Sequence, residues 1–170
     1  MKSEYDVKQI SKDQCKQLLN DYHYLSKISK GFKSKYNLGL FKNDIIVGVI
    51  IFTGFPVPEL VKGIYNLDRT DQDGFFELSR LVLSPEIQST EHNIASWFVS
   101  KAIKNLKSDN KVRAILSYAD SAYHDGTLYR ACNFKYYGLS DKKKDFWIKL
   151  SDNSFEKLSR GKTKNIDELH

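Results

Sequence analysis

The sequence predicts one α/β domain built on a mixed sheet of about six to seven strands, with helices on both faces. Apolar runs of strand length alternate with helix-like stretches along most of the 170 residues. One long amphipathic helix separates two such runs, which is typical of a β-α-β unit with a right-handed crossover. The hydrophobic content of 41% supports a real core. We expect residues 1–150 to form the domain and residues 151–170 to form a polar tail.

The N-terminal half is expected to place one helix between a short strand and a hairpin. Ser11 begins the helix, and Gln14 completes a capping box with it. Residues 37–54 predict a two-stranded hairpin with its turn at 42–44. Residues 55–74 contain two prolines and several acidic side chains, so we expect them to be irregular.

The C-terminal half is expected to supply the central strands and the helix between them. Residues 89–110 carry apolar side chains at helical spacing, so one face of this helix should lie in the core. The run at 112–120 is apolar until its polar end, as in a strand covered on both faces. The other expected elements are a strand at 75–86, a two-turn helix at 125–133, and strands at 135–140 and 145–150.

The charge distribution favours a polyanionic partner. The formal net charge is +6, and lysines gather at 26–36 together with two aromatic residues. Lysines that neutralise phosphates release counterions, so this stretch is a candidate DNA contact. A solvated loop is the alternative interpretation. The candidate DNA-binding residues are Lys27, Lys30, Lys33 and Lys35.

Several classes of protein are disfavoured. The two cysteines, Cys15 and Cys132, are expected to be reduced thiols, and the histidines show no metal-ligand spacing, so no metal site is predicted. We expect no signal segment, and no apolar stretch approaches the roughly 20 residues of a membrane span. A cytoplasmic protein is therefore expected.

Polar side chains interrupt the apolar strand expected at 75–86. They are Glu77, Ser79 and Arg80. Buried charge is unfavourable unless it is paired, so these residues suggest a strand that lines a polar cleft. The alternative is that Glu77 and Arg80 face solvent or pair with each other.

The junction after this strand is a second candidate site. A helix N-terminus exposes unpaired N–H groups that can hold a phosphate or a carboxylate. Ser89 or Thr90 is expected to cap the helix, with Asn93 and Ser96 placed to contact a ligand. Ordinary helix capping is the alternative.

A dense polar stretch follows the strand expected at 112–120. Ligands bind at the carboxyl ends of strands in such sheets, so this stretch predicts one wall of an active site. Asp125 is expected to be only a turn or cap residue. The candidate site residues here are Ser117, Tyr118, Asp120, His124 and Tyr129.

These stretches resemble the Mom family of phage DNA modification proteins, within the fold of the GCN5-related N-acyltransferases. The similar segments together cover most of residues 20–150, and the last is the most specific. They are YHYL (22–25), VGVIIFTGFP (47–56), ELSRLVL (77–83), NIASWFVSKAIK (93–104) and SYADSAYHDGTLYRACNFKYYGLS (117–140).

The resemblance implies an enzyme that converts the N6 amine of adenine in double-stranded DNA to a carbamoylmethylamino or related acyl- or glycyl-derived group. The modified phage DNA would resist host restriction, and the protein would be phage-encoded and act in the bacterial cytoplasm. The adenine must be flipped out of the duplex.

The resemblance also implies roles for particular residues. Asp120 is the first candidate to contact the amine and His23 the second, while Tyr129 resembles a tyrosine that protonates the leaving group. Ser79 completes the implied catalytic set. The resemblance also implies a functional role for Tyr24. The candidate substrate- or donor-binding residues are Tyr24 and, from the polar stretches described above, Glu77, Arg80, Asn93, Ser96, Ser117, Tyr118 and His124.

The donor molecule stays open. Acetyl-CoA users of this fold carry a glycine-rich loop, Q/R-x-x-G-x-G/A, where this sequence has SPEIQSTEHN (84–93) without a glycine. An acyl-CoA and an aminoacyl group, for instance on tRNA, are both compatible; an iron-dependent route has no support from ligand spacing. Two other functions are weighed: an N-acetyltransferase acting on a protein or small-molecule amine, and a non-catalytic DNA-binding anti-defence protein.

Overall fold

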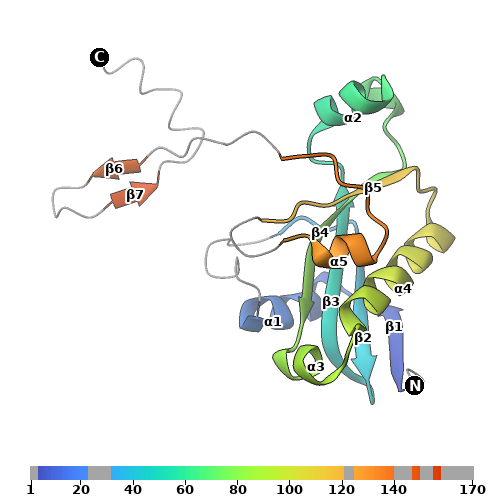
Figure 1. Cartoon of the computed structure of the whole chain (residues 1–170), viewed down its shortest axis with the longest axis vertical. Helices are drawn as coiled ribbons and strands as arrows, with labels where there is room; N and C mark the ends of the chain where they lie inside the picture. Colours follow the sequence, from blue (N-terminus) through green and yellow to red (C-terminus); the bar gives the residue numbers. More distant parts are fainter. Residues whose placement is uncertain (1–3, 23–31, 121–124, 140–146, 150–154, 158–170) are drawn as a thin grey trace. The chain divides into compact units, whose positions relative to one another are not determined.

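A computed structural model describes residues 4–22, 32–120, 125–139, 147–149 and 155–157. The chain divides into two compact units, Met1–Lys135 and Tyr136–His170. The first unit contains a five-stranded mixed sheet with helices, and the second contains a two-stranded sheet (Figure 1). The predicted α/β class is confirmed, although the main sheet has fewer strands than the six to seven expected. The domain boundary at residue 150 stays a prediction.

The strands of the main sheet lie side by side in the order in which they occur in the chain. The first four strands pair antiparallel with one another, whereas the last strand is parallel to the fourth. The predicted β-α-β crossover is therefore present. The strands are β1 (Tyr5–Gln9), β2 (Tyr36–Lys42), β3 (Ile45–Gly54), β4 (Phe75–Leu83) and β5 (Ala114–Leu116).

The helices of the described chain are mostly short. Two local predictions, the cap of the first helix and the turn of the hairpin, are confirmed. The Ser11 N–H donates to Gln14 Oε1 at 2.9 Å, and the Gln14 N–H donates to Ser11 Oγ at 3.2 Å, which completes the capping box. Asn43 and Asp44 both have positive φ (49° and 64°), as a tight hairpin turn requires. The helices are α1 (Lys12–Tyr22), α2 (Pro58–Tyr65), the 3₁₀ turn η1 (Arg69–Asp71), α3 (Pro85–Thr90), α4 (Ile94–Asp109) and α5 (Thr127–Ala131).

Four expected elements differ from the structure. The strand expected over 112–120 is only Ala114–Leu116, and its residues are half-buried. The segment expected to be irregular contains α2 and η1, because Pro58 is tolerated in the first turn of a helix. The single helix expected over 89–110 is instead two helices, α3 and α4, and Asn93 between them has a left-handed φ of 59°. Residues 135–139 form no strand, and Gly138 has a φ of 102°, which is incompatible with a strand.

The second unit holds a small antiparallel hairpin. Its strands are β6 (Trp147–Lys149) and β7 (Phe155–Lys157), which pair with each other. The strand expected at 145–150 is therefore present as β6. The partner strand β7 lies within the stretch expected to be a polar tail.

Helices cover both faces of the main sheet, as predicted. On one face α4 buries Phe98, Ala102 and Leu106 against side chains of β2, β3 and β4. On the other face α1 buries Cys15 and Leu19 against the sheet. Helices α4 and α5 lie in front of the sheet in Figure 1, and α1 lies beside its lower half. Both sides of the central strands are thus apolar, which agrees with their continuous apolar sequences.

Truncation of the α4 face should destabilise the fold strongly. Phe98 is fully buried, so Phe98→Ala is expected to lower the free energy of unfolding by about 3–5 kcal/mol. Lys104→Ala, an exposed position on the same helix, should change it by less than about 0.5 kcal/mol. Urea unfolding of both variants measures the difference. Equal stability of the two variants would contradict the packing described above.

Candidate active site

The candidate active site lies where β4 and β5 separate. The parallel ladder between them covers only Phe75–Glu77 on β4. Beyond Leu116 the chain leaves the ladder, whereas β4 continues to Leu83. The Ser117 hydroxyl donates to the Leu78 carbonyl at 3.0 Å, which holds the departing chain beside β4. The structure therefore places Ser117 next to the middle of β4.

Strand β4 carries a bulge at Ser79. Leu78 pairs with Phe52 of β3, and Arg80 pairs with the adjacent residue Ile51. Ser79, between Leu78 and Arg80, therefore has no partner in this ladder. The Ser79 hydroxyl instead donates to the Ile51 carbonyl at 3.2 Å. An unpaired residue at the point where two strands separate is typical of a functional bulge.

The bulge brings two charged side chains onto one face of the sheet. Glu77 lies opposite Thr53, and Arg80 lies opposite Ile51, two residues earlier on β3. Because side chains alternate along β3, all four point to the face that α1 covers. Without the extra residue, positions 77 and 80 would lie on opposite faces.

Glu77 is half-buried on this face and is the centre of a polar group. The Thr53 hydroxyl donates to Glu77 Oε2 at 3.4 Å. Burial raises the pKa of Glu77, and the Thr53 hydrogen bond and the Arg80 charge oppose this effect. Burial and then the Glu77 charge raise the pKa of Tyr118. We call Thr53, Glu77, Arg80 and Tyr118 the Glu77 group; sequence analysis identified all of them except Thr53.

An aromatic group adjoins the Glu77 group. Phe75 precedes Glu77 by two residues and lies on the same face of β4. Its ring meets Phe55 and Tyr65 edge to face, with centroids 6.1 and 5.1 Å away, and the Arg113 guanidinium lies 4.9 Å from its centroid. Phe75 is 3% exposed, whereas Tyr65 is 48% exposed. Sequence analysis did not identify Tyr65, because α2, which carries it, was expected to be irregular.

A buried acceptor lies on the same face. Asn37 on β2 pairs with Ile51, so it stands in one row with Arg80. It is 9% exposed, and its Oδ1 has no hydrogen-bond partner among the residues that the structure describes. Leaving a buried acceptor unpaired costs about 1–3 kcal/mol, so Asn37 Oδ1 is a candidate to accept a hydrogen bond from a ligand or a water. A single asparagine in an apolar strand gave no signal in the sequence.

The expected cap of the long helix is wrong. Ser89 and Thr90 end α3 instead, and their hydroxyls donate to the Glu86 carbonyl at 2.9 and 2.8 Å. Helix α4 begins after Asn93, and the Ser96 hydroxyl donates to the Asn93 carbonyl at 3.1 Å. The structure does bring Asn93 and Ser96 together, and their contact with a ligand stays a prediction.

Asp120 and Tyr129 both follow β5. Asp120 is exposed in the coil after that strand. Tyr129 is half-buried on α5, where its ring meets Phe134 edge to face at 5.5 Å. Helix α5 packs on α4, and the Cys132 thiol contacts the Ser96 carbonyl at 3.7 Å. The catalytic roles of Asp120 and Tyr129 stay predictions.

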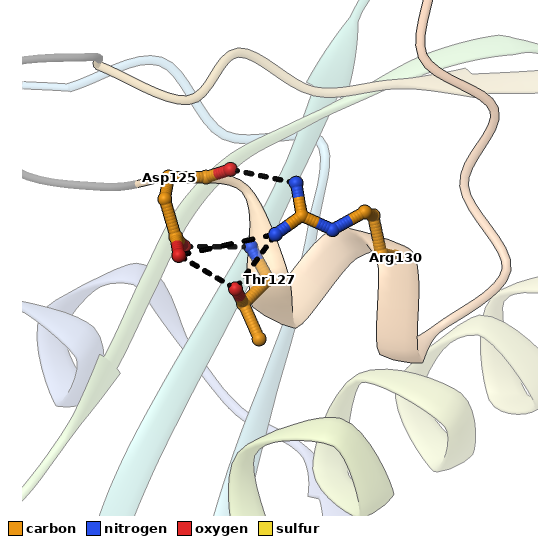
Figure 2. Close-up of polar contacts among 3 residues, drawn as sticks. All are labelled: Asp125, Thr127 and Arg130. Atoms are coloured by element: carbon orange, nitrogen blue, oxygen red, sulfur yellow. Dashed lines mark hydrogen bonds and ion pairs between the residues drawn. The ribbon is translucent and has the colours of Figure 1, made fainter.

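Asp125 organises the start of α5. Figure 2 shows its carboxylate accepting hydrogen bonds from the Thr127 N–H (2.9 Å) and the Thr127 hydroxyl (2.8 Å). Arg130 donates to the Asp125 carbonyl and to Thr127 Oγ1, both at 2.9 Å. The hydrogen bonds from Thr127, followed by the Arg130 charge, lower the pKa of Asp125. Asp125 is therefore the turn residue that the sequence predicted.

Some predicted site residues fall outside the described residues. Lys33 and Lys35 are described and exposed, and the Lys35 ammonium lies 5.0 Å from the Phe76 ring centroid. Among the residues described, no three His, Cys, Asp or Glu side chains gather as a metal site would require. No helix in the described part of the chain is long and apolar enough to cross a membrane. The predicted residues outside the description are His23, Tyr24, Lys27, Lys30 and His124.

A comparison with protein families shows to which family the chain belongs. The sequence profile of the Mom protein family matches residues 4–167. The chain belongs to the Mom protein family. A comparison with curated proteins finds no match.

Solved structures confirm the acyltransferase-like fold of this Mom family chain. An integron cassette protein from V. cholerae has a TM-score of 0.56 at 12% identity, with 83% of this chain and 91% of that chain covered. An aminoglycoside N-acetyltransferase in complex with CoA has a TM-score of 0.55 at 8% identity, with 82% and 93% covered. A ribosomal-protein-alanine N-acetyltransferase from Brucella melitensis has a TM-score of 0.55 at 14% identity, with 82% and 98% covered.

The raised pKa of Glu77 predicts a pH-dependent stability difference. A carboxyl whose pKa is raised on folding contributes stability below its unfolded pKa and loses it as the pH rises through its folded pKa. Glu77→Gln should therefore be more stable than the parent near pH 7, by up to about 1 kcal/mol because water still screens a half-buried group. The difference should shrink near pH 4.

Thermal unfolding at the two pH values measures this difference. Glu59→Gln, at an exposed position of α2, is the matched control and should show little change at either pH. A Glu77→Gln protein that is less stable than the parent at neutral pH would show that the charged form of Glu77 is favoured by folding.

Proposed function

We propose that this Mom family protein is a transferase that modifies the N6 amine of adenine in DNA. The family match over residues 4–167 carries the proposal. The acyltransferase-like fold supports a group-transfer reaction, and the net charge of +6 supports a polyanionic partner. The product is a carbamoylmethylamino or related group, which protects phage DNA from host restriction in the bacterial cytoplasm.

The N6 amine of adenine is a weak nucleophile, so the reaction needs a catalytic group beside it. The lone pair of the adenine N6 amine is delocalised into the ring, so attack needs an acceptor for the developing proton. Asp120 takes this role first, and His23 is the second candidate. Asp120 is exposed in the coil four residues beyond the end of β5, so a substrate can reach it. Tyr129 protonates the leaving group.

For an acyl- or glycyl-derived product, the N6 amine bonds to the donor's carbonyl carbon and the donor's carrier leaves, so that carbonyl needs hydrogen-bond donors as charge develops on it. A carbamoylmethyl product requires the new bond at the methylene carbon next to the carbonyl instead. The bulge at Ser79 supports such a role, because a residue without a ladder partner leaves its backbone groups available. The coil that begins at Ser117 lies beside it through the hydrogen bond to Leu78. Backbone N–H groups of these two segments are the proposed donors.

The DNA is held through its phosphates and the base is flipped out. Flipping costs roughly a few kcal/mol, which contacts to the extruded base offset. Lys27, Lys30, Lys33 and Lys35 are the proposed phosphate contacts.

An N-acetyltransferase that acts on a protein or small-molecule amine is a second candidate. The similarity to an aminoglycoside N-acetyltransferase solved with CoA favours it. The connection between β4 and α4 argues against it, because α3 stands where acetyl-CoA users of this fold carry a glycine-rich loop. If this second function were correct, acetyl-CoA should raise the melting temperature of the protein.

DNA modification is tested directly by nucleoside mass spectrometry. We expect DNA from bacteria that express the protein to contain a deoxyadenosine heavier by one carbamoylmethyl group. Asp120→Asn and Tyr129→Phe should abolish the peak without loss of folded protein. An added group of another mass would identify a different donor. Full modification by both variants would show that the assigned roles are wrong, and the absence of any modified base with abundant folded parent protein would count against the proposed activity.

The lysine contacts predict a change in the salt dependence of DNA binding. Each phosphate contact contributes about 0.9 to the slope of log affinity against log salt concentration. Lys33→Ala with Lys35→Ala should therefore reduce the slope by about 2. Lys107→Ala, at an exposed position near the end of α4, should leave it unchanged. An unchanged slope in the double variant would place the DNA elsewhere.

A further inference from the structure

We propose that Asn37 and Arg80 bind a small ligand that carries both an N–H group and a carbonyl or carboxylate oxygen, as an α-amino acid or its amide does. This inference rests on the proposed function, because it assigns that chemical class to the donor of the transfer reaction. It concerns the face of the sheet that α1 covers. Sequence analysis named Arg80 as a candidate binding residue and did not identify Asn37.

Polar side chains gather on one part of this face. Asn37, Ile51 and Arg80 form one row across β2, β3 and β4, and Thr53 and Glu77 form part of the adjacent row. Side chains two residues apart on a strand share a face, so both rows point to the side of α1. Four polar side chains therefore lie next to Ile51.

Asn37 lacks a hydrogen-bond donor for its side-chain oxygen. The residue is 9% exposed, and its Oδ1 has no partner among the residues that the structure describes. Its backbone carbonyl accepts a hydrogen bond from the Ile10 N–H at 3.1 Å, so the sheet fixes the strand at this position. A buried acceptor without a partner is unfavourable, and a ligand that donates an N–H to Oδ1 removes this penalty.

Arg80 lacks an acceptor for its guanidinium. It is half-buried, and no hydrogen bond or ion pair joins its side chain to another residue in the described part of the chain. Its charge opposes the rise in the pKa of Glu77, but these two side chains form no ion pair. A guanidinium presents its N–H donors in a planar fork that matches the oxygens of a carboxylate. Arg80 is therefore available to an oxygen of a ligand.

One small ligand can meet both needs. Neighbouring strands lie about 4.8 Å apart, so the backbones of Asn37 and Arg80 are roughly 10 Å apart. The long Arg80 side chain spans part of this separation, so a few ligand atoms are enough to connect the two side chains. The Glu77 carboxylate in the adjacent row disfavours a second anion and favours an amine or amide N–H beside Asn37. Arg80 is the more exposed of the two, so the ligand reaches Asn37 past Arg80.

Glycine and glycinamide are the simplest compounds of this class. Both carry an amine, but glycine ends in a carboxylate and glycinamide ends in a neutral amide. The carbamoylmethyl group of the proposed product carries an amide of the same kind, so a donor of this class fits the proposed function.

Ligand-observed NMR tests this binding in the whole protein, without DNA. Glycine or glycinamide should bind at millimolar concentrations, since a ligand of so few atoms has limited affinity. Ethylamine, which lacks the oxygen, and acetate, which lacks the N–H, should bind about tenfold more weakly. Stronger binding of glycinamide would identify an amide-bearing donor, and stronger binding of glycine would identify a free carboxylate.

Asn37→Leu tests the acceptor directly. Leucine has a similar shape and no polar atom, so the variant should bind both compounds about tenfold more weakly and melt no lower than the parent. Asn37→Ala, which cannot overpack the site, is the second variant and should lose the same binding. Asn20→Leu, at an exposed position of α1, is the matched control and should bind as the parent does. Arg80→Lys, which keeps the charge without the planar fork, should weaken the binding of glycine.

Two results would overturn the proposal. They are the absence of binding of glycine and glycinamide to the parent protein, and equal binding by the parent and both Asn37 variants. Either result leaves the proposed function standing if modified deoxyadenosine is still formed. Binding that depends on Asn37, in a protein that forms no modified base, would instead support the ligand site and count against the proposed function.

Discussion

The parallel pairing between β4 and β5, which ends after Phe75–Glu77, is the constraint on which the candidate site depends. If the ladder continued, β5 would cover the edge of β4 and leave no room for a reacting group between the strands. The hydrogen bond from Ser117 to Leu78 fixes where the separation begins. The bulge at Ser79 then reverses which face of the sheet each following side chain points to, so that Leu78 and Leu83 lie in the same core.

One extra residue therefore has two effects that cannot be separated. It keeps the apolar side chains of β4 in the core under α4, and it brings Arg80 onto the face that holds Glu77. The Arg80 charge then moderates the unfavourable burial of the Glu77 carboxylate. A single charged residue in the middle of a sheet would be difficult to accommodate without such a partner. Stability and the electrostatics of the candidate site thus depend on the same backbone irregularity.

Local sequence signals predicted the elements that local interactions determine. The capping box at Ser11, the turn at Asn43 and Asp44, and the role of Asp125 all depend on residues within a few positions of each other. The Glu77 group was only partly predictable, because Thr53 joins it through the register of two strands. Nothing in the sequence indicates a bulge, so the side of the sheet on which Arg80 lies could not be derived from the alternation of side chains along a strand. The exposed Tyr65 was missed for a related reason, since α2 begins at a proline that looked like a breaker.

The segment between β4 and α4 bears most directly on the donor. The backbone there forms the short helix α3 and then turns through the left-handed Asn93, so its N–H groups are directed by helical bonding instead of by a glycine loop. The first N–H groups of a helix have no partner within it, so the starts of α3 and α4 can still expose N–H groups, although not in the arrangement of a glycine-rich loop. The chain therefore has the separated strands of the acyltransferase-like fold, while the segment after β4 differs from the glycine-rich loop of acetyl-CoA users. For the proposed transfer reaction, this combination favours a donor held mainly at the strands, through the bulge and the coil after β5, over one held at the start of α4.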